Sequence, residues 1–274
     1  MPFTVLNNIL NTTANDTTPY NWRPTVDGNF IAQYPSEQLD AGDLVKVPKM
    51  IGYTTDEGTT ELPGPVNTTA ELKGYLSSTT TYGWALDERV VSELFKLYPN
   101  NTSLGIPSSE ELGGNVTFPQ TYGAAFRQIA AYHGDAQFIA ATRYTCELWA
   151  AHNLTAYCYR FNTNTDDYNW EEGVAHFSAV IFIFIFNNLY GYGFSPNPFV
   201  GARESYADLS YLVSGSWISF TNSLDPNAWT RRGRKATRTE NRPVYDLEKP
   251  FSMIYDANVS SYAAPHTWCK GVLH

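Results

Sequence analysis

The sequence predicts an α/β fold that is rich in helices and has a few short strands. Short apolar segments bounded by turn residues recur along the chain, which is typical of buried strands. Longer segments with apolar residues at helical spacing lie between them. Hydrophobic residues make up 43% and charged residues only 16% of the 274 residues, so the chain can build a sizeable core. We therefore expect helices packed on a small sheet, with no internal domain boundary.

The first half is expected to carry one strand and several helices. Residues 1–20 are rich in Asn and Thr and are predicted to form surface loop. A helix should begin near Ser36, and a short buried strand should follow Val47, break at Gly52 and enter an acidic turn. Further helices are predicted after the capping box Thr68–Glu71, after Asp87, and over residues 121–132 and 135–152.

The second half is expected to alternate strands and helices. Strands are predicted over residues 156–161 and 251–255, and a helix over residues 205–222. The run Ile181–Phe186 is apolar on both faces, which favours a buried strand but leaves a helix open. Helical spacing of Phe138, Thr142, Cys146 and Trp149 indicates a core face.

Charge and hydropathy limit the classes of partner. The net charge of −9 argues against nucleic acid and against anionic membrane surfaces. The longest apolar run, Ile181–Phe186, is far too short to span a bilayer, so we expect no membrane span.

Eight N-x-S/T sequons favour a secreted glycoprotein. The asparagines are Asn11, Asn15, Asn67, Asn100, Asn101, Asn115, Asn153 and Asn258. The first residues carry no basic segment followed by an apolar one, so no signal peptide is recognised, although the composition predicts an extracellular protein. Three cysteines cannot all pair within one chain; buried free thiols are expected, and a pair that lacks its fourth member is the alternative.

Two features point to acid–base chemistry. Asp56 and Glu57 follow directly after a buried strand, the position at which α/β sheets collect functional groups. The alternative is an acidic turn that faces solvent. His176 lies in a turn after a later strand, and an acid that precedes a histidine along the chain is the order found in Ser–acid–His triads of one hydrolase fold. A hydrogen-bonded structural histidine is the alternative for His176.

Six segments resemble the type-B carboxylesterase/lipase family, in particular its fungal secreted members. They occur in the family's order between about residues 20 and 262. The segments are PTVDGNFIAQYPSEQL, KVPKMIGYTTDEGT, RYTCELWAAHNLTAYCYRFN, GVAHFSAVIFIFIFNN, WISFTNSLDPN and RPVYDLEKPFSMIYDANVSSY.

The resemblance implies a partial α/β-hydrolase fold and names two catalytic residues. The family's triad acid falls on Glu57, in the D-E-G turn, and its base falls on His176, while Asp56 points elsewhere. The implied substrate is a carboxylic ester, and neither a metal nor an organic cofactor is implied. Ala179 departs from the family, which usually has an acid three residues after the histidine.

The family's nucleophile motif is missing from this sequence. No G-x-S-x-G occurs, and the glycine-rich oxyanion loop is absent too. Residues 1–274 are therefore expected to be the C-terminal portion of a type-B carboxylesterase domain, inactive alone, whose serine comes from upstream or from a complementary N-terminal half. The alternatives are a non-catalytic esterase-like binding module and a degenerate truncated chain. The retention of Glu57 and His176 favours the portion of an enzyme and the degenerate chain over the binding module.

Overall fold

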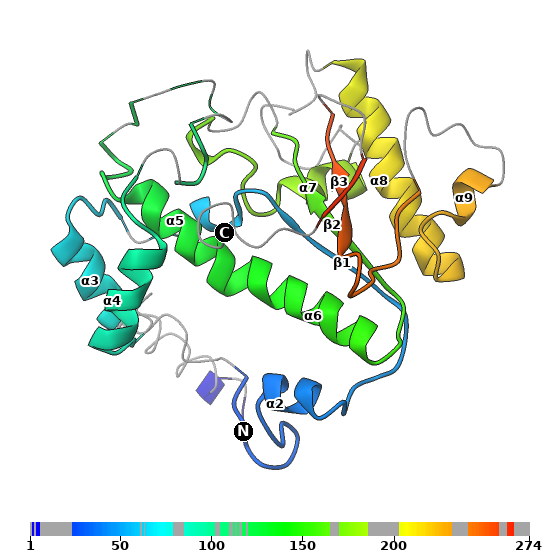
Figure 1. The fold of residues 1–274 in the computed structure, drawn as a ribbon, viewed down its shortest axis with the longest axis horizontal. Helices are drawn as coiled ribbons and strands as arrows, with labels where there is room; N and C mark the ends of the chain where they lie inside the picture. Colours follow the sequence, from blue (N-terminus) through cyan, green and yellow to red (C-terminus); the bar gives the residue numbers. More distant parts are fainter. Residues whose placement is uncertain are drawn as a thin grey trace. The chain divides into compact units, whose positions relative to one another are not determined.

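The computed structural model describes most of the chain, whose ribbon is drawn in Figure 1. The chain divides into two compact units. The units are described separately. The described residues are 2, 4, 5, 24–60, 62, 64–78, 85–101, 105–109, 112, 114, 117–118, 120–164, 170–185, 203–231, 241–257 and 262–265. None of the helices within these residues is long and apolar enough to cross a membrane.

The smaller unit comprises Met1–Leu44, Leu62–Leu97 and Pro119–Phe126. Its helices are α2 (Pro35–Asp40), α3 (Thr69–Ser77) and α4 (Glu88–Leu97). The predicted capping box is present, because the Thr68 hydroxyl accepts from the Glu71 amide while the Glu71 carboxylate accepts from the Thr68 amide. The Asp87 carboxylate likewise accepts from the Val90 amide at the start of α4. The predicted starts of α2, α3 and α4 are confirmed.

The larger unit comprises Val45–Glu61, Tyr98–Phe118 and Arg127–His274, and it contains the described sheet. Four strands lie in the order β1-β2-β3-β4; β1 pairs parallel with β2, β2 parallel with β3, and β3 antiparallel with β4. Their bounds are β1 (Lys49–Thr54), β2 (Ala156–Phe161), β3 (Phe251–Tyr255) and β4 (Tyr262–Pro265). Strands β2 and β3 have the predicted bounds, β1 was predicted with different bounds, and β4 was not predicted.

Strand β1 does not break at Gly52, as the sequence had suggested, but continues to Thr54. Gly52 pairs with Tyr159 of β2, and the Tyr159 ring occupies the space in which a Cβ atom on Gly52 would lie. The glycine is therefore needed for close packing within the sheet and not for a turn.

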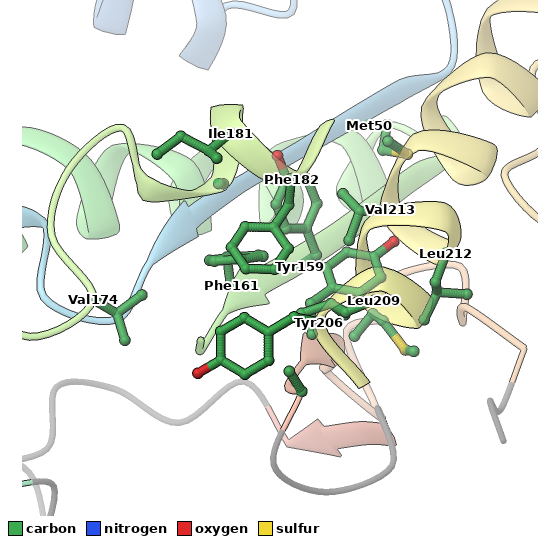
Figure 2. Packing of buried hydrophobic residues seen from close by; sticks show 14 of the residues in the cluster. Met50, Tyr159, Phe161, Val174, Ile181, Phe182, Tyr206, Leu209, Leu212 and Val213 are labelled. Atoms are coloured by element: carbon green, nitrogen blue, oxygen red, sulfur yellow. The ribbon is translucent and has the colours of Figure 1, made fainter. Parts of the chain in front are cut away.

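Helices cover both faces of this sheet, which makes the unit an α/β structure (Figure 1). Helix α8 (Glu204–Ser223) packs with Tyr159 and Phe161 on one face, in a core that Figure 2 shows from close by. Cys158 points to the opposite face, because successive side chains in a strand alternate, and α6 (Ala140–Ala151) packs there. Helix α6 follows α5 (Phe126–Gly134) and the π-helical turn η2 (Asp135–Ile139) in one nearly continuous helical run.

The apolar run after residue 180, for which propensity favoured a strand and length left a helix open, is helical. It forms α7 (Ser178–Val180) and the π-helical turn η4 (Ile181–Ile185), while Phe186 lies outside the described residues. Phe182 is fully buried between Phe161 of β2 and Tyr206 of α8. The Ser210 and Ser214 hydroxyls of α8 donate to carbonyl groups of η4, so tertiary contacts stabilise a conformation that local propensity disfavours.

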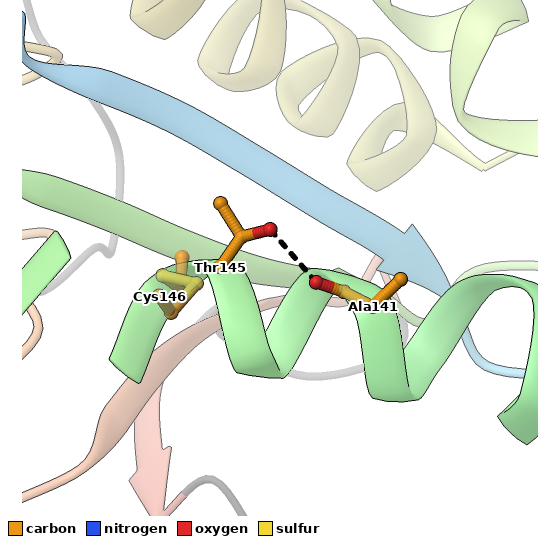
Figure 3. The surroundings of a disulfide bond; sticks show 4 residues. Ala141, Thr145 and Cys146 are labelled. Atoms are coloured by element: carbon orange, nitrogen blue, oxygen red, sulfur yellow. Dashed lines mark hydrogen bonds between the residues drawn. A yellow bond between two sulfur atoms is a disulfide. The ribbon is translucent and has the colours of Figure 1, made fainter. Parts of the chain in front are cut away.

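A disulfide bond joins α6 to β2, with Cα atoms 6.5 Å apart (Figure 3). It links Cys146 and Cys158, so the expectation of free thiols is wrong for both. The connection between α6 and β2 is only a few residues long, which brings the end of the helix against the strand that follows it. Cys269 lies outside the described residues.

Candidate active site

The acidic turn is built directly onto the carboxyl end of β1. Its residues form the short 3₁₀ helix η1 (Glu57–Thr59), and Glu57 is only 5% exposed. The Thr54 amide donates to Glu57 Oε1 at 2.7 Å. The solvent-facing alternative for this turn is therefore wrong, and the second carboxylate oxygen of Glu57 remains to bind another partner.

His176 supplies that partner from a segment 119 residues further along the chain. Its Nδ1 lies 2.5 Å from Glu57 Oε2, and its side chain is 39% exposed. Because a carboxylate only accepts hydrogen bonds, the proton between them belongs to Nδ1 in the neutral imidazole. Nε2 is then the basic nitrogen of His176. The expected pairing of the two predicted residues is confirmed.

Asp56 joins the acidic turn to the loop that carries His176. It is 1% exposed, and its Oδ2 accepts from the Val174 amide at 2.7 Å. The Asp56 amide donates back to the Val174 carbonyl at 3.0 Å, and Asp56 forms a parallel bridge with Ala175. Gly173 has φ +61°, and a Cβ atom there would collide with the Asp56 carboxylate. The two adjacent acids thus have different partners: Glu57 binds the imidazole, and Asp56 binds the backbone that precedes it.

Phe138 packs against His176, as Phe177 does at a longer centroid distance of 6.4 Å, and sequence reasoning missed the Phe138 contact. Its ring lies 4.6 Å from the imidazole, centroid to centroid, at an interplanar angle of 35°. Helical spacing had placed Phe138 on a core face, and the residue is indeed half-buried. Spacing within one helix cannot reveal a contact with a distant loop, so no local signal was available.

Two other described histidines and two serines make different contacts. His133 is buried beside the Gln137 amide, and His152 is exposed at the C-terminal end of α6. The hydroxyl of Ser216 is buried and donates to the Leu212 carbonyl within α8, whereas Ser178 is half-buried at the start of α7. His266 and His274 lie outside the described residues.

The predicted glycosylation sites are partly described. Asn67, Asn100, Asn101 and Asn153 are all exposed, which is compatible with modification. Asn11, Asn15, Asn115 and Asn258 lie outside the described residues. Within the part of the chain that the structure describes, no group of three or more His, Cys, Asp and Glu side chains could hold a metal ion.

Comparison with known proteins identifies the family. The model of the carboxylesterase family matches residues 3–262. "Secreted lipase 1" of Botryotinia fuckeliana is 28% identical over 215 residues, which are 77% of this chain and 33% of the relative. "Lipase 2" of Geotrichum candidum is 29% identical over 209 residues, 76% of this chain and 32% of the relative.

A secreted lipase of Arthroderma benhamiae is 26% identical over 212 residues, 75% of this chain and 33% of the relative. The matched part of this chain thus spans about a third of the length of each of these relatives. Since the family model covers nearly the whole sequence, the chain belongs to the carboxylesterase family.

Proposed function

We propose that this chain is the C-terminal portion of a serine carboxylic-ester hydrolase, folded as part of an α/β-hydrolase domain. In the complete enzyme Glu57 is the triad acid and His176 the triad base. The observation that carries the proposal is the hydrogen bond between buried Glu57 Oε2 and His176 Nδ1 at the carboxyl end of parallel strands. Membership of the carboxylesterase family supports the reaction class, and the names of the fungal relatives support an extracellular ester hydrolase.

The proposed chemistry assigns one task to each residue. His176 Nε2 removes the proton of a serine hydroxyl, and the serine oxygen attacks the ester carbonyl. The imidazolium is stabilised by the Glu57 carboxylate, and it then protonates the departing alcohol. Water, activated by the same nitrogen, releases the acid from the acyl-enzyme. The serine and the oxyanion donors come from a complementary segment of the enzyme, because no G-x-S-x-G motif occurs in this sequence.

The test is a chimera that carries this chain in place of the matched segment of the Geotrichum candidum lipase. We expect the chimera to hydrolyse an activated ester and His176→Ala to reduce kcat by about 10⁴-fold or more. His152→Ala is the matched control and should leave the rate unchanged, because His152 is an exposed residue at the end of α6.

The chain alone should not hydrolyse the ester faster than its own His176→Ala variant does. A burst of product from the lone chain that His176→Ala abolishes would contradict the proposal, since it would reveal a nucleophile within these residues. A folded chimera without activity would instead favour a degenerate chain or a non-catalytic module.

A further inference from the structure

We propose that Phe138 is a positioning residue for His176, a role that rests on the proposed function of the Glu57–His176 pair. The Phe138 ring lies against one face of the imidazole, 4.6 Å away and tilted by 35°. One hydrogen bond to Glu57 fixes the position of Nδ1 but leaves the ring free to tilt about that bond. A tilted contact against the ring face restricts this freedom and so helps to fix the direction in which Nε2 points.

The place of Phe138 in the helical run explains why it reaches the site. It belongs to η2, the π-helical turn between α5 and α6, and such turns insert one extra residue into an α-helix. Gly134 precedes this turn and touches the acidic turn: a Cβ atom on Gly134 would lie 2.9 Å from the Gly58 nitrogen and 3.7 Å from Glu57 Cβ. Residues four apart lie on the same face of a helical run, so one surface contacts both the acid and the base.

The Phe138 ring is itself braced on another side. The His133 ring packs edge-on against it, with centroids 6.4 Å apart and an interplanar angle of 82°. His133 is only 4% exposed, and its Nε2 lies 2.7 Å from the Gln137 amide nitrogen. Because a buried neighbour limits its movement, Phe138 can act as a rigid support for the more exposed imidazole of His176.

The support has an expected kinetic signature. The face of an aromatic ring attracts a cation, so Phe138 favours the imidazolium that forms during the reaction over the neutral ring of the resting enzyme. Removing the aromatic face should therefore lower kcat and leave KM unchanged. Aromatic pairs of this kind correspond to a change of about twofold to tenfold in rate.

The experiment compares Phe138→Leu, which keeps apolar volume but removes the ring, with Phe184→Ala as the control. Phe184 is 72% exposed in η4, so its truncation should not affect the imidazole. NMR of the full chain with labelled histidine rings provides a readout that is independent of activity. In the wild type, the Phe138 ring current should shift the carbon-bound His176 ring protons upfield of those of His152. Phe138→Leu should reduce this shift to the smaller contribution of Phe177, whose ring centroid lies 6.4 Å from that of the imidazole, and should increase the fast motion of the His176 ring.

The second readout is kcat in the chimera, where Phe138→Leu should cost about twofold to tenfold at constant KM. Absence of the wild-type ring-current shift would overturn the inference without any variant, even if Phe138→Leu failed to fold. A reduced shift with unchanged ring motion and unchanged kcat would overturn the positioning role. If His176→Ala left the chimera active, the proposed function would fail, whereas the NMR result would still report on the contact itself.

Discussion

Substitution Glu57→Gln tests the acid–base pair, because the structure determines which way the new amide must face. Glu57 Oε1 accepts from the Thr54 amide at 2.7 Å, and Oε2 faces His176 Nδ1 at 2.5 Å. A glutamine that keeps its oxygen toward Thr54 must direct its NH₂ group at Nδ1. His176 can accept that hydrogen bond only if its own proton moves to Nε2.

The preference for this orientation of the glutamine amide can be estimated from the cost of the opposite one. Turning the glutamine oxygen toward His176 would place NH₂ against the Thr54 N–H and leave that buried donor without an acceptor. An unsatisfied buried donor costs about 1–3 kcal/mol, which corresponds to roughly a 5-fold to 150-fold preference for the first orientation. In that orientation Nε2 carries the proton and cannot act as a base. An acid-to-amide change that gives the wrong tautomer lowers kcat by about 10⁴-fold in serine proteases, and we expect a similar loss in the chimera.

The assay is a two-dimensional ¹H–¹⁵N spectrum of the histidine rings, recorded with labelled protein. Wild type should show His176 with the proton on Nδ1, and Glu57→Gln should show it on Nε2. Glu171→Gln is the charge-matched control, since it removes an acid from η3 (Trp170–Glu172) without touching the imidazole. A Glu57→Gln protein that is folded and still carries the proton on Nδ1 would refute the orientation argument.

Three further predictions concern other parts of the chain. Expressed behind a signal peptide in a eukaryotic host, the protein should lose mass on enzymatic deglycosylation; an unchanged mass would count against the sequons. Replacing Cys146 and Cys158 together by alanine should lower the free energy of unfolding in urea by about 3 kcal/mol, because their separation of 12 residues closes a short loop. Burial raises the pKa of Tyr245 to about 12. In the folded protein the Tyr245 hydroxyl therefore keeps a proton that it loses at pH ~10 in the unfolded chain. Stability from Tyr245 is complete below pH ~10 and is lost as the pH approaches 12, and Tyr245→Phe should reduce the slope of stability against pH in that window.

The sequence predicted those parts of the fold that depend on interactions between residues close together in the chain. The capping box at Thr68 and the cap at Asp87 each satisfy amide groups at a helix start, so the pattern alone locates them. Strand β2 has the predicted bounds, because a short apolar and aromatic run between turn residues is typical of a strand. Chain order and turn composition also identified Glu57 and His176, which the fold then brings together.

Signals that arise from distant contacts were not visible in the sequence. Gly52 was taken for a break because its packing partner, the Tyr159 ring, lies more than a hundred residues away. For the run that begins at Ile181, β-propensity favoured a strand and left a helix open, and serine hydroxyls of α8 stabilise it as a π-helical turn. Residue counting favoured free thiols and kept one pair as the alternative, and the short return from α6 into β2 sets Cys146 against Cys158.

The hydrogen bond between Glu57 and His176 depends on a contact between their neighbours, Asp56 and Ala175. His176 reaches Glu57 across 119 residues because parallel pairing of β1 with β2 aligns their carboxyl ends, and the Asp56 bridge to Ala175 extends that alignment by one step. The two acids of the turn are both buried, but they have different partners. Asp56 is almost completely buried against backbone amides, so it holds the loop, while Glu57 next to it can bind a partly exposed ring. In this turn Asp56 therefore fixes the backbone that precedes His176, and this fixes the geometry in which Glu57 meets the imidazole.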